Sequence, residues 1–292
     1  MVEGLGVRAI LVPYDSGHRG ARMGRGPEHL LANGLRGALG PNRKEVHQVV
    51  VESASIPPAE VATAFELDRL VSLEVRAAIE AGEFPLVLSG NCNASLGTLG
   101  GIGPSSSLGI VWFDAHADFN TPETTTTGFT DGMGLATAVG HCWSAMAASI
   151  PNFNPLAESN VVLVGARDTS RAERNRLDDS EILIVGAELA EREGLPEALA
   201  AALDALRSRV GSVYVHLDLD VLDAERVGPA NEFAVRGGLT REELEDAISM
   251  IRGRFTVAAA GIASYDPALD GTGAVLQAGL ACARALVAPP RV

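Results

Sequence analysis

The sequence has no cluster of lysine or arginine. Of its 292 residues, 23 are basic and 37 are acidic, which gives a formal net charge of −14 at pH 7. Proteins that bind nucleic acid through the phosphate backbone carry a basic patch, so this class of protein fits poorly. We therefore expect no nucleic-acid partner. We interpret most of the excess acid as a solubilising surface.

Cysteine and long apolar runs are also scarce. The three cysteines, Cys92, Cys142 and Cys282, are odd in number and far apart, which argues against a disulfide framework and fits a reducing compartment. No apolar run reaches the roughly 18 residues of a membrane-spanning helix, and the N-terminus does not resemble a signal peptide. We expect a cytoplasmic protein without a membrane partner.

What the sequence does contain is a series of short runs rich in Val, Ile, Leu and Ala. They lie at residues 9–12, 47–51, 85–88, 108–113, 160–164, 181–185, 213–219 and 257–263. Their lack of polar alternation is typical of strands that are buried on both faces of a parallel sheet.

Helix-like stretches separate these runs. We predict helices over 61–81, 187–209, 240–252 and 274–287, the third opened by a capping box between Thr240 and Glu243. We see no repeat and no break in composition. The alternation predicts one α/β domain over residues 1–292, with three layers and a parallel sheet of about eight strands.

Ligands of such folds bind beyond the carboxyl ends of the strands. Directly after the run 108–113 come Asp114, His116 and Asp118, whose spacing of two places them on one side if the strand continues. Two carboxylates and an imidazole on one side require a partner, and a cation supplies it. These ligand types suit Mn²⁺, with zinc or iron as alternatives. A solvated strand end with incidental acids is the other interpretation.

Two further strand ends carry similar groups. Asp218 and Asp220 lie at the end of the run 213–219, and we expect them to share one side of that strand. Burying such carboxylates is unfavourable unless they are compensated, so two acidic strand ends favour a binuclear site with shared carboxylates. Cys92 follows the run 85–88 and is either a third kind of ligand or a small buried residue.

These strand ends resemble the signatures of the ureohydrolase family, which contains arginase, agmatinase and their relatives. Residues 114–118 are similar to the DAHxD signature, residues 218–220 to the DxD signature, and residues 120–128 to the NTPxTTxSG loop of arginase without a gap. Shorter similarities lie at 24–27, 165–168 and 237–240, so the resemblance spans nearly the whole chain. It implies a three-layer arginase-like fold and a metal-dependent hydrolase of linear amidines.

The resemblance also implies roles for individual residues, beginning with two Mn²⁺ ions as cofactors. One ion would be held by Cys92, Asp114, Asp118 and Asp218. The other would be held by Asp114, His116, Asp218 and Asp220. Asp118 would also orient a hydroxide that lies between the ions and attacks the guanidino carbon.

The resemblance extends to the amino-acid end of a substrate. Asn120, Thr125 and Thr127 match positions that bind an α-carboxylate, and Glu173 matches an acid that contacts the α-amino group. The companion of that acid is Ser170 in this chain. The alternative is that the threonine run is only a polar loop.

Three positions depart from the family pattern. Cys92 replaces the histidine ligand of the GGDHS motif, here Ser89–Asn93, and Asp131 replaces a histidine that is a proposed proton shuttle. We therefore place Asp131 beside Asp118 as a catalytic residue. Ser264 replaces the glutamate that pairs with the substrate guanidinium, so we place it among the substrate-binding residues.

Loss of that glutamate removes a charge partner for a cationic guanidinium and favours a less basic substrate. The chain resembles an arginase-like branch that also carries cysteine for the histidine ligand and hydrolyses N-hydroxy-L-arginine to hydroxyurea and L-ornithine. This is our predicted reaction. Arginine, agmatine and formimino compounds are alternative substrates, and a metal-binding pseudoenzyme is the alternative class.

The role of His216 and the oligomeric state of the protein each have two interpretations. His216, which precedes Asp218 by two residues, is either a satisfied core histidine or a group that supports the ligands. Arginases often form trimers with the help of a C-terminal tail, which we do not recognise after the last predicted helix. We expect a monomer, with a homo-oligomer as the alternative.

Overall fold

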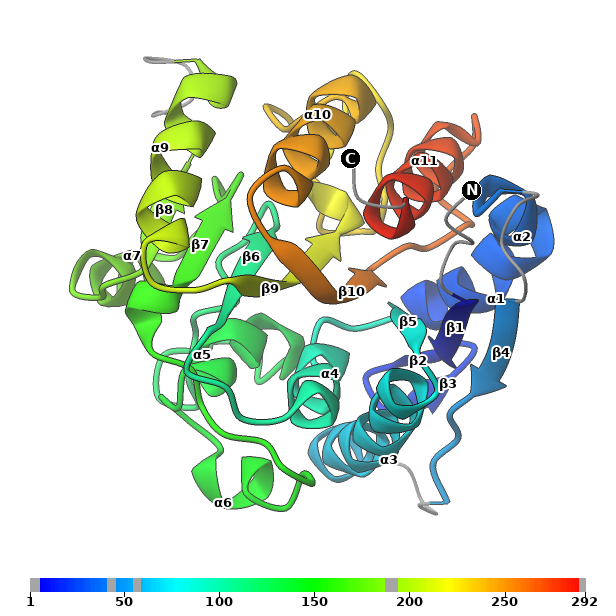
Figure 1. Ribbon diagram of the computed structural model, residues 1–292, viewed down its shortest axis with the longest axis horizontal. Coiled ribbons are helices and arrows are strands. Elements are labelled where there is room, and N and C mark those ends of the chain that lie inside the picture. Colours follow the sequence, from blue (N-terminus) through cyan, green and yellow to red (C-terminus); the bar gives the residue numbers. More distant parts are fainter. Residues whose placement is uncertain (1–5, 41–45, 55–58, 187–193, 289–292) are drawn as a thin grey trace.

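A sheet of eight parallel strands lies between two layers of helices in the computed structural model, which describes residues 6–40, 46–54, 59–186 and 194–288 (Figure 1). The order across the sheet is β4-β1-β5-β10-β9-β6-β7-β8. Its strands are β1 (Gly6–Val12), β4 (Val46–Val50), β5 (Glu83–Ser89), β6 (Leu108–Phe113), β7 (Val161–Val164), β8 (Leu183–Val185), β9 (Ser212–Asp218) and β10 (Thr256–Ala263). A short antiparallel pair, β2 (Tyr14–Asp15) and β3 (His18–Arg19), lies apart from it.

The helices divide between the two faces of the sheet (Figure 1). One face is covered by α3 (Glu60–Glu80), α4 (Ala94–Ile102) and α5 (Gly134–Ala138). The other is covered by α1 (Gly26–Leu30), α9 (Leu195–Arg207), α10 (Arg241–Arg252) and α11 (Ala274–Val287). The remaining short helices are α2 (Arg36–Ala38), α6 (Ser144–Ala147) and α7 (Arg171–Asp178).

The predicted three-layer fold and its eight-stranded parallel sheet are confirmed. β6 spans the predicted residues, and α11 does so as well. The capping box before α10 is present, with Glu243 N donating to Thr240 Oγ1 and Thr240 N donating to Glu243 Oε2. Of the helix predicted over 187–209, α9 begins at Leu195, and residues 187–193 lie outside the described part of the chain.

α4 was not predicted because its glycines oppose helix formation. Packing explains them: a Cβ at Gly97 would lie against Asp68 O and the side chain of Val71, and one at Gly101 would lie against Val75. α3 and α4 therefore approach each other too closely for side chains at these positions. Tertiary contact thus overrides local propensity here.

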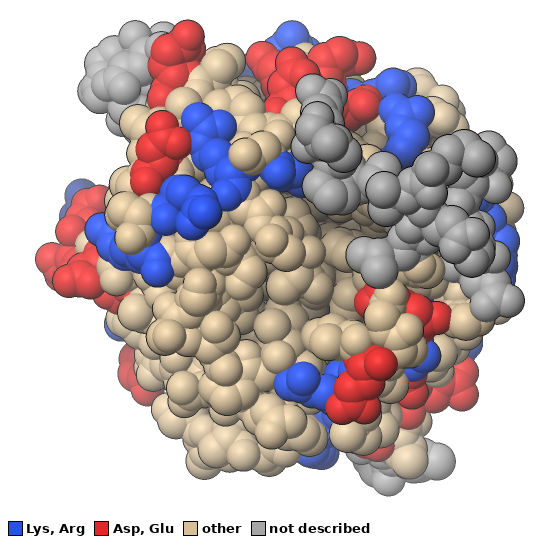
Figure 2. All heavy atoms as spheres, viewed as in Figure 1, with Lys and Arg blue, Asp and Glu red and all other residues tan. Residues whose placement is uncertain are grey.

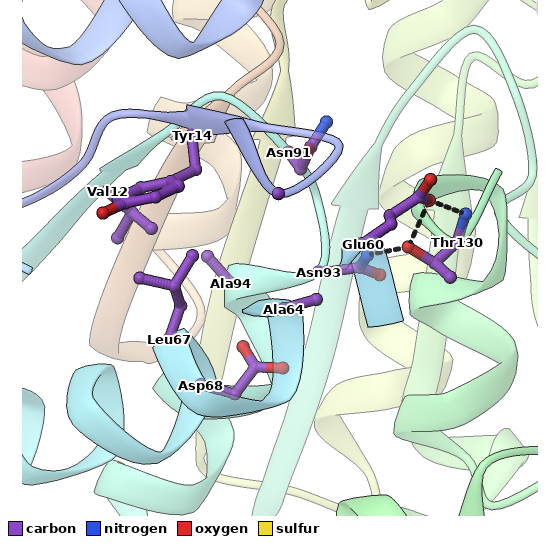
Figure 3. A pocket seen from close by; sticks show the side chains of 11 residues that line it. Val12, Tyr14, Glu60, Ala64, Leu67, Asp68, Asn91, Asn93, Ala94 and Thr130 are labelled. Carbon is purple, nitrogen blue, oxygen red and sulfur yellow. Dashed lines mark hydrogen bonds between the residues drawn. The ribbon is translucent and has the colours of Figure 1, made fainter. Parts of the chain in front are cut away.

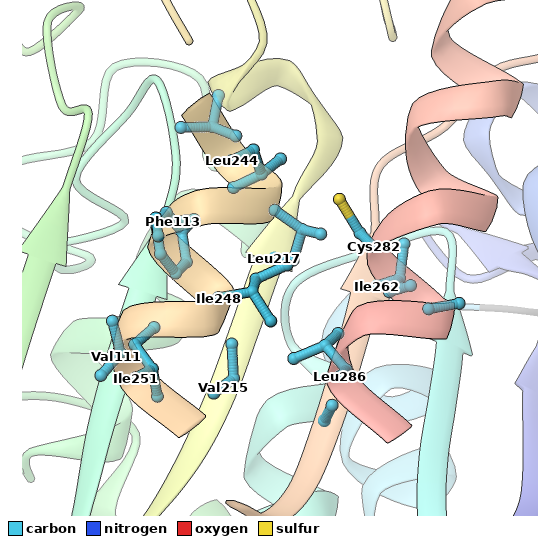
Figure 4. Packing of buried hydrophobic residues seen from close by; sticks show 14 of the residues in the cluster. Val111, Phe113, Val215, Leu217, Leu244, Ile248, Ile251, Ile262, Cys282 and Leu286 are labelled. Atoms are coloured by element: carbon cyan, nitrogen blue, oxygen red, sulfur yellow. The ribbon is translucent and has the colours of Figure 1, made fainter. Parts of the chain in front are cut away.

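Apolar side chains fix the sheet between its helices. Figure 4 shows Leu244, Ile248 and Ile251 of α10 above strand residues that include Phe113 and Leu217, and all five are buried in one cluster. Complete burial of one such side chain stabilises the fold by about 1.5–3 kcal/mol. The strand ends are therefore held on a rigid support.

Four central strands, β5, β10, β9 and β6, bring distant parts of the chain together. β5 and β6 follow each other in sequence, yet β10 and β9 lie between them. Phe113 pairs with Leu217, Asp218 with Ala263, and Ile262 with Leu88, so the carboxyl ends of these strands lie nearly level. Residues that follow the four strands consequently meet at one edge of the sheet.

Among the described residues, no helix is both long enough and apolar enough to span a membrane.

A buried acid, Asp68, lies between α3 and α4. Its Oδ1 accepts a hydrogen bond from Gly97 N at 3.3 Å, whereas its Oδ2 has no hydrogen-bond partner among the described residues. Burial raises the pKa of Asp68 well above the usual 3.8, and the Gly97 bond opposes this shift only in part. The folded state therefore holds this proton more tightly than the unfolded state does, and the stability contributed by Asp68 falls as the pH rises from 3.8 towards the raised pKa.

We predict that Asp68→Asn stabilises the protein increasingly as the pH is raised. The variant removes the ionisation, which is worth about 1.4 kcal/mol for each unit of pKa difference that is crossed. Thermal unfolding of parent and variant at a series of pH values from about 4 to about 8 measures the effect. Asp246→Asn, an exposed position of α10, is the matched control. A difference in Tm between parent and Asp68→Asn that does not change with pH contradicts the prediction.

Candidate metal centre

The turn after β5 carries Cys92 to the carboxyl edge of the sheet. Gly90 is required there because a Cβ would collide with Tyr14 O and with the backbone of Gly24. Cys92 is buried, and its Sγ lies 3.0 Å from Asp218 Oδ2 and 3.4 Å from Ser264 Oγ. The ends of β5, β9 and β10 thus meet at one thiol.

The residues after β6 reach the same place by a different geometry from the one expected. β6 ends at Phe113 and Asp118 has a φ of 49°, so the condition under which the three side chains would share one side of a strand is not met. The chain leaves the sheet because Ala115 O accepts hydrogen bonds from Arg167 N and Asp168 N, which belong to the turn after β7. The loop nevertheless directs Asp114 and His116 into one cluster.

The expectation for the second acidic strand end is corrected in the same way. β9 ends at Asp218, and Asp220 lies in a short 3-10 helix, Leu219–Val221, rather than on the strand. Asp220 N donates to Asp218 Oδ1 at 2.8 Å, so the first carboxylate caps the turn that carries the second. Both carboxylates remain buried at the edge of the sheet.

Two groups of ligand atoms result. Those of Cys92, Asp114 and Asp218 lie within 4.8 Å of one another, and so do those of Asp114, His116 and Asp220. Asp114 belongs to both groups, as a bridging carboxylate does. Asp118 is not part of either, but its buried Oδ2 has no hydrogen-bond partner in the described ranges.

Burial and mutual repulsion shape the electrostatics of these acids. Burial raises the pKa of Asp114, Asp118 and Asp218, and neighbouring carboxylates raise each of them further. Burial also raises the pKa of the Cys92 thiol, with Asp218 adding to the effect. All four groups would thus favour their neutral forms unless positive charge compensates them.

His116 is the positive exception. Its Nδ1 lies 3.3 Å from both Asp114 Oδ1 and Asp220 Oδ2. Burial lowers the pKa of His116, but the two carboxylates together raise it well above its usual value. Burial likewise opposes the shift at Asp220, whose pKa His116 holds below its usual value.

These residues fit a pair of divalent cations. The cluster offers several carboxylate oxygens, one imidazole and one thiol, a set that Mn²⁺-like ions accept. The unpartnered Asp118 Oδ2 and the repulsion among the buried carboxylates are the features that a cation would relieve. A shared carboxylate, Asp114, suits two ions rather than one.

A surrounding layer that the sequence analysis missed orients the acids. Trp112 Nε1 donates to Asp114 Oδ2 at 3.1 Å, and Asn231 Nδ2 donates to Asp220 Oδ2 at 3.1 Å and to Ser264 O at 3.0 Å. The alternation of β6 could have indicated Trp112, which precedes Asp114 by two residues. Asn231 lies in a loop, and no spacing pattern points to it.

His216 is a core residue in contact with this layer. Its ring stacks on Trp112 with centroids 3.7 Å apart, and its Nδ1 lies 3.0 Å from the hydroxyl of Tyr214. Burial lowers the pKa of His216 to about 3, so the imidazole is neutral. The ring supports Trp112 and, through it, Asp114.

The acids open into a pocket of about 200 Å³. Most predicted site residues line it, namely Cys92, His116, Asp118, Asn120, Thr127, Asp131, Glu173, Asp218, Asp220 and Ser264. Asp114 and Thr125 are not among the lining residues. The apolar part of the lining was not predicted: it includes Met23, Phe129 and Phe233, with the centroids of the two phenylalanine rings 5.6 Å apart.

The residues predicted to bind an amino acid are partly engaged within the protein. Glu173 Oε1 accepts from Phe119 N at 3.0 Å, and Glu173 forms a capping box with Ser170 at the start of α7. Thr125 Oγ1 and Thr127 Oγ1 accept from the backbone of Gly128 and Phe129. The loop is thus ordered by its own threonines, and Asn120, Thr127 and Glu173 line the pocket.

Comparison with known proteins agrees with this geometry. The sequence model of the arginase family matches residues 6–287. The arginase of Bacillus caldovelox is 31% identical over 207 residues, which cover 70% of this chain and 69% of that protein, and the arginase of Staphylococcus aureus is 30% identical over 207 residues, covering 70% and 68%.

Solved structures are similar over nearly the full length. The Bacillus caldovelox arginase structure superposes with a TM-score of 0.87 at 25% identity and covers 99% of both chains. The Bacillus subtilis arginase structure gives a TM-score of 0.87 at 26% identity and covers 98% of this chain and 100% of that one. The chain therefore belongs to the arginase family and is a hydrolase of carbon–nitrogen bonds in linear amidines.

Proposed function

We propose that this chain hydrolyses N-hydroxy-L-arginine to hydroxyurea and L-ornithine with two Mn²⁺ ions. The observation that carries the substrate assignment is Ser264, which stands in the pocket where the family has a glutamate for the guanidinium. Its hydroxyl lies 3.4 Å from Cys92 Sγ and supplies no negative charge. A cationic guanidinium lacks its partner there, whereas the less basic N-hydroxyguanidine depends on that partner less.

The residues proposed to hold the ions are those of the two groups of ligand atoms. Asp118 is added to the first group and Asp218 to the second, because they match ligand positions of the arginase family. Cys92, Asp114, Asp118 and Asp218 hold one ion, and Asp114, His116, Asp218 and Asp220 hold the other. When bound, such a pair lowers the pKa of water and so supplies a nucleophile near neutral pH.

The side chains of the pocket have different roles: proton transfer, binding of the amino-acid end and exclusion of water. Asp118 Oδ2, buried and without a hydrogen-bond partner among the described residues, accepts a proton from the attacking water and returns it to the departing amine. Asn120, Thr127 and Glu173 bind the α-amino acid end. Phe129 and Phe233 pack against the methylene chain and exclude water from the reacting carbon.

L-Arginine is the second candidate substrate. The relatives that share 30–31% of their residues with this chain over about two thirds of their length are named arginase. Asn120, Thr127 and Glu173 would bind the same amino-acid end in both substrates, so the difference lies at the guanidino group.

Turnover of a substrate panel tests the proposed function directly. We expect the Mn²⁺-loaded protein to release hydroxyurea from N-hydroxy-L-arginine with a higher kcat/KM than it releases urea from L-arginine or agmatine. Chelation should abolish both reactions, and added Mn²⁺ should restore them. A fully loaded protein that releases neither product is a pseudoenzyme, and the proposal is then wrong.

Metal content tests Cys92. We predict that Cys92→Ala weakens binding of one ion by at least about tenfold, because a ligand is lost, and that Cys92→His retains both ions. Elemental analysis after dialysis against graded chelator measures this. Cys142→Ala is the matched control, since Cys142 is also buried but does not line the pocket. Equal metal retention in Cys92→Ala and the control would show that Cys92 is no ligand.

Selectivity tests Ser264. We predict that Ser264→Glu raises kcat/KM for L-arginine relative to N-hydroxy-L-arginine by about 10–100-fold, the effect of a charged hydrogen bond worth about 1.5–3 kcal/mol. Ser264→Gln has nearly the same size and the same backbone strain at φ 64° but no charge, so it separates charge from shape. The same selectivity in both variants would contradict the charge argument.

A further inference from the structure

Two loops meet beside the metal centre: the turn that carries Cys92 and the end of the threonine-rich loop. Asp131, which is buried, joins them. Its Oδ1 accepts hydrogen bonds from Cys92 N and, at 3.3 Å, from Asn93 N, and its Oδ2 accepts from Asn91 Nδ2 at 2.8 Å. One carboxylate thus binds three consecutive residues, with Cys92 in the middle.

A second set of bonds fixes Asp131 itself. Thr130 N and Thr130 Oγ1 donate to Glu60 Oε1 at 2.6 and 2.7 Å, and Asn93 Nδ2 donates to Thr130 Oγ1 at 3.1 Å. Figure 3 shows these three bonds running from the start of α3 through Thr130 to Asn93. Glu60, Asn93 and Thr130 also line a cavity of about 20 Å³, which has room for a single water.

The segment after Asp131 holds the other ligand loop. Asn120 N donates to Gly132 O at 3.1 Å, and Ala136 N donates to Asp118 O at 3.0 Å. The Cys92 turn and the loop from Asp114 to Asn120 are therefore both attached to residues 130–136. A displacement of Asp131 would separate Cys92 from the carboxylates with which it shares a site.

We propose that Asp131 is a positioning residue that holds the Cys92 thiol in place for the metal pair, and that it does not carry protons to or from the substrate. The inference rests on the proposed role of Cys92 as a ligand. Both oxygens of Asp131 are already engaged by donors of the turn, which leaves the carboxylate committed to that turn. Because the middle donor is the backbone N of Cys92, the hydrogen bond fixes the residue from which Sγ projects.

The hydrogen bond between Asn91 and Asp131 offers a sharp test because the donor and the acceptor can be exchanged by substitution. Asn91 Nδ2 donates to Asp131, and Asn91 Oδ1 accepts from Ser16 N at 2.9 Å. In Asp131→Asn two amide donors face each other, and in Asn91→Asp two carboxylates do. In the double variant an amide and a carboxylate face each other again. The side chain at position 131 can still accept from Cys92 N and Asn93 N, and the side chain at position 91 can still accept from Ser16 N. The composition and net charge of the double variant equal those of the parent.

The experiment compares parent, Asp131→Asn, Asn91→Asp and the double variant after loading with Co²⁺, whose thiolate-to-metal absorption reports Cys92 directly. We expect each single variant to lose about 10–100-fold in Co²⁺ affinity with a weakened thiolate band. We expect the double variant to regain the thiolate band and to bind Co²⁺ within a few-fold of the parent's affinity. Its kcat with Mn²⁺ should recover to the same extent as its affinity. If the single variants fail to fold, recovery of folding and of the band in the double variant carries the same conclusion.

Three outcomes would overturn the inference. The first is a single variant with unchanged affinity and band. The second is a double variant that regains the band while its kcat stays as low as that of Asp131→Asn, because then the carboxylate at position 131 acts in proton transfer. The third is a double variant that remains unfolded or fails to regain the band. Absence of the band in the parent overturns the assignment of Cys92 as a ligand as well, which distinguishes failure of the proposed function from failure of the positioning role alone.

Discussion

Repulsion among buried carboxylates at one edge of the sheet is the constraint on which this structure depends. Asp114, Asp118, Asp218 and Asp220 are all buried, and His116 contacts two of them, with its Nδ1 3.3 Å from Asp114 Oδ1 and from Asp220 Oδ2. The fold tolerates them because apolar side chains on both faces of the sheet fix the strands from which they project. Packing between the sheet and its helices thus stabilises the fold, so the edge of the sheet can carry a set of buried acids that attract divalent cations.

Surrounding hydrogen bonds convert this cluster into a defined site. Trp112 and Asn231 orient individual acids, and the backbone N of Ala115 donates to Asp220 Oδ1 at 3.1 Å. The lining of the pocket divides into polar groups and an apolar set that includes the rings of Phe129 and Phe233. This division suits a substrate that has an amino-acid head, an apolar chain and a polar group at the reacting end.

Much of the fold and of the ligand set can be predicted from sequence. Uninterrupted apolar runs indicate buried parallel strands, and acids placed directly after them must meet at one edge, because parallel strands share a direction. The route of the chain is not predictable in the same way. The spacing of Asp114, His116 and Asp118 would place them on one side of a continuing strand, but β6 ends at Phe113, where the chain bonds to the turn after β7. Likewise α4 is hidden by glycines that only its contact with α3 explains, and Asn231 acts from a loop without any periodic pattern.

The order of the strands has a consequence for how the molecule acquires its site during synthesis. Cys92 and Asp114 follow β5 and β6, which are made early, but these strands are not neighbours: β10 and β9 fill the space between them. A nascent chain that ends before residue 212 therefore exposes two unpaired strand edges and carries four of the six proposed ligands, lacking Asp218 and Asp220. Insertion of the last two strands would close the sheet and bring together both groups of candidate ligands in the same event, so we expect metal to be incorporated at the final stage of folding.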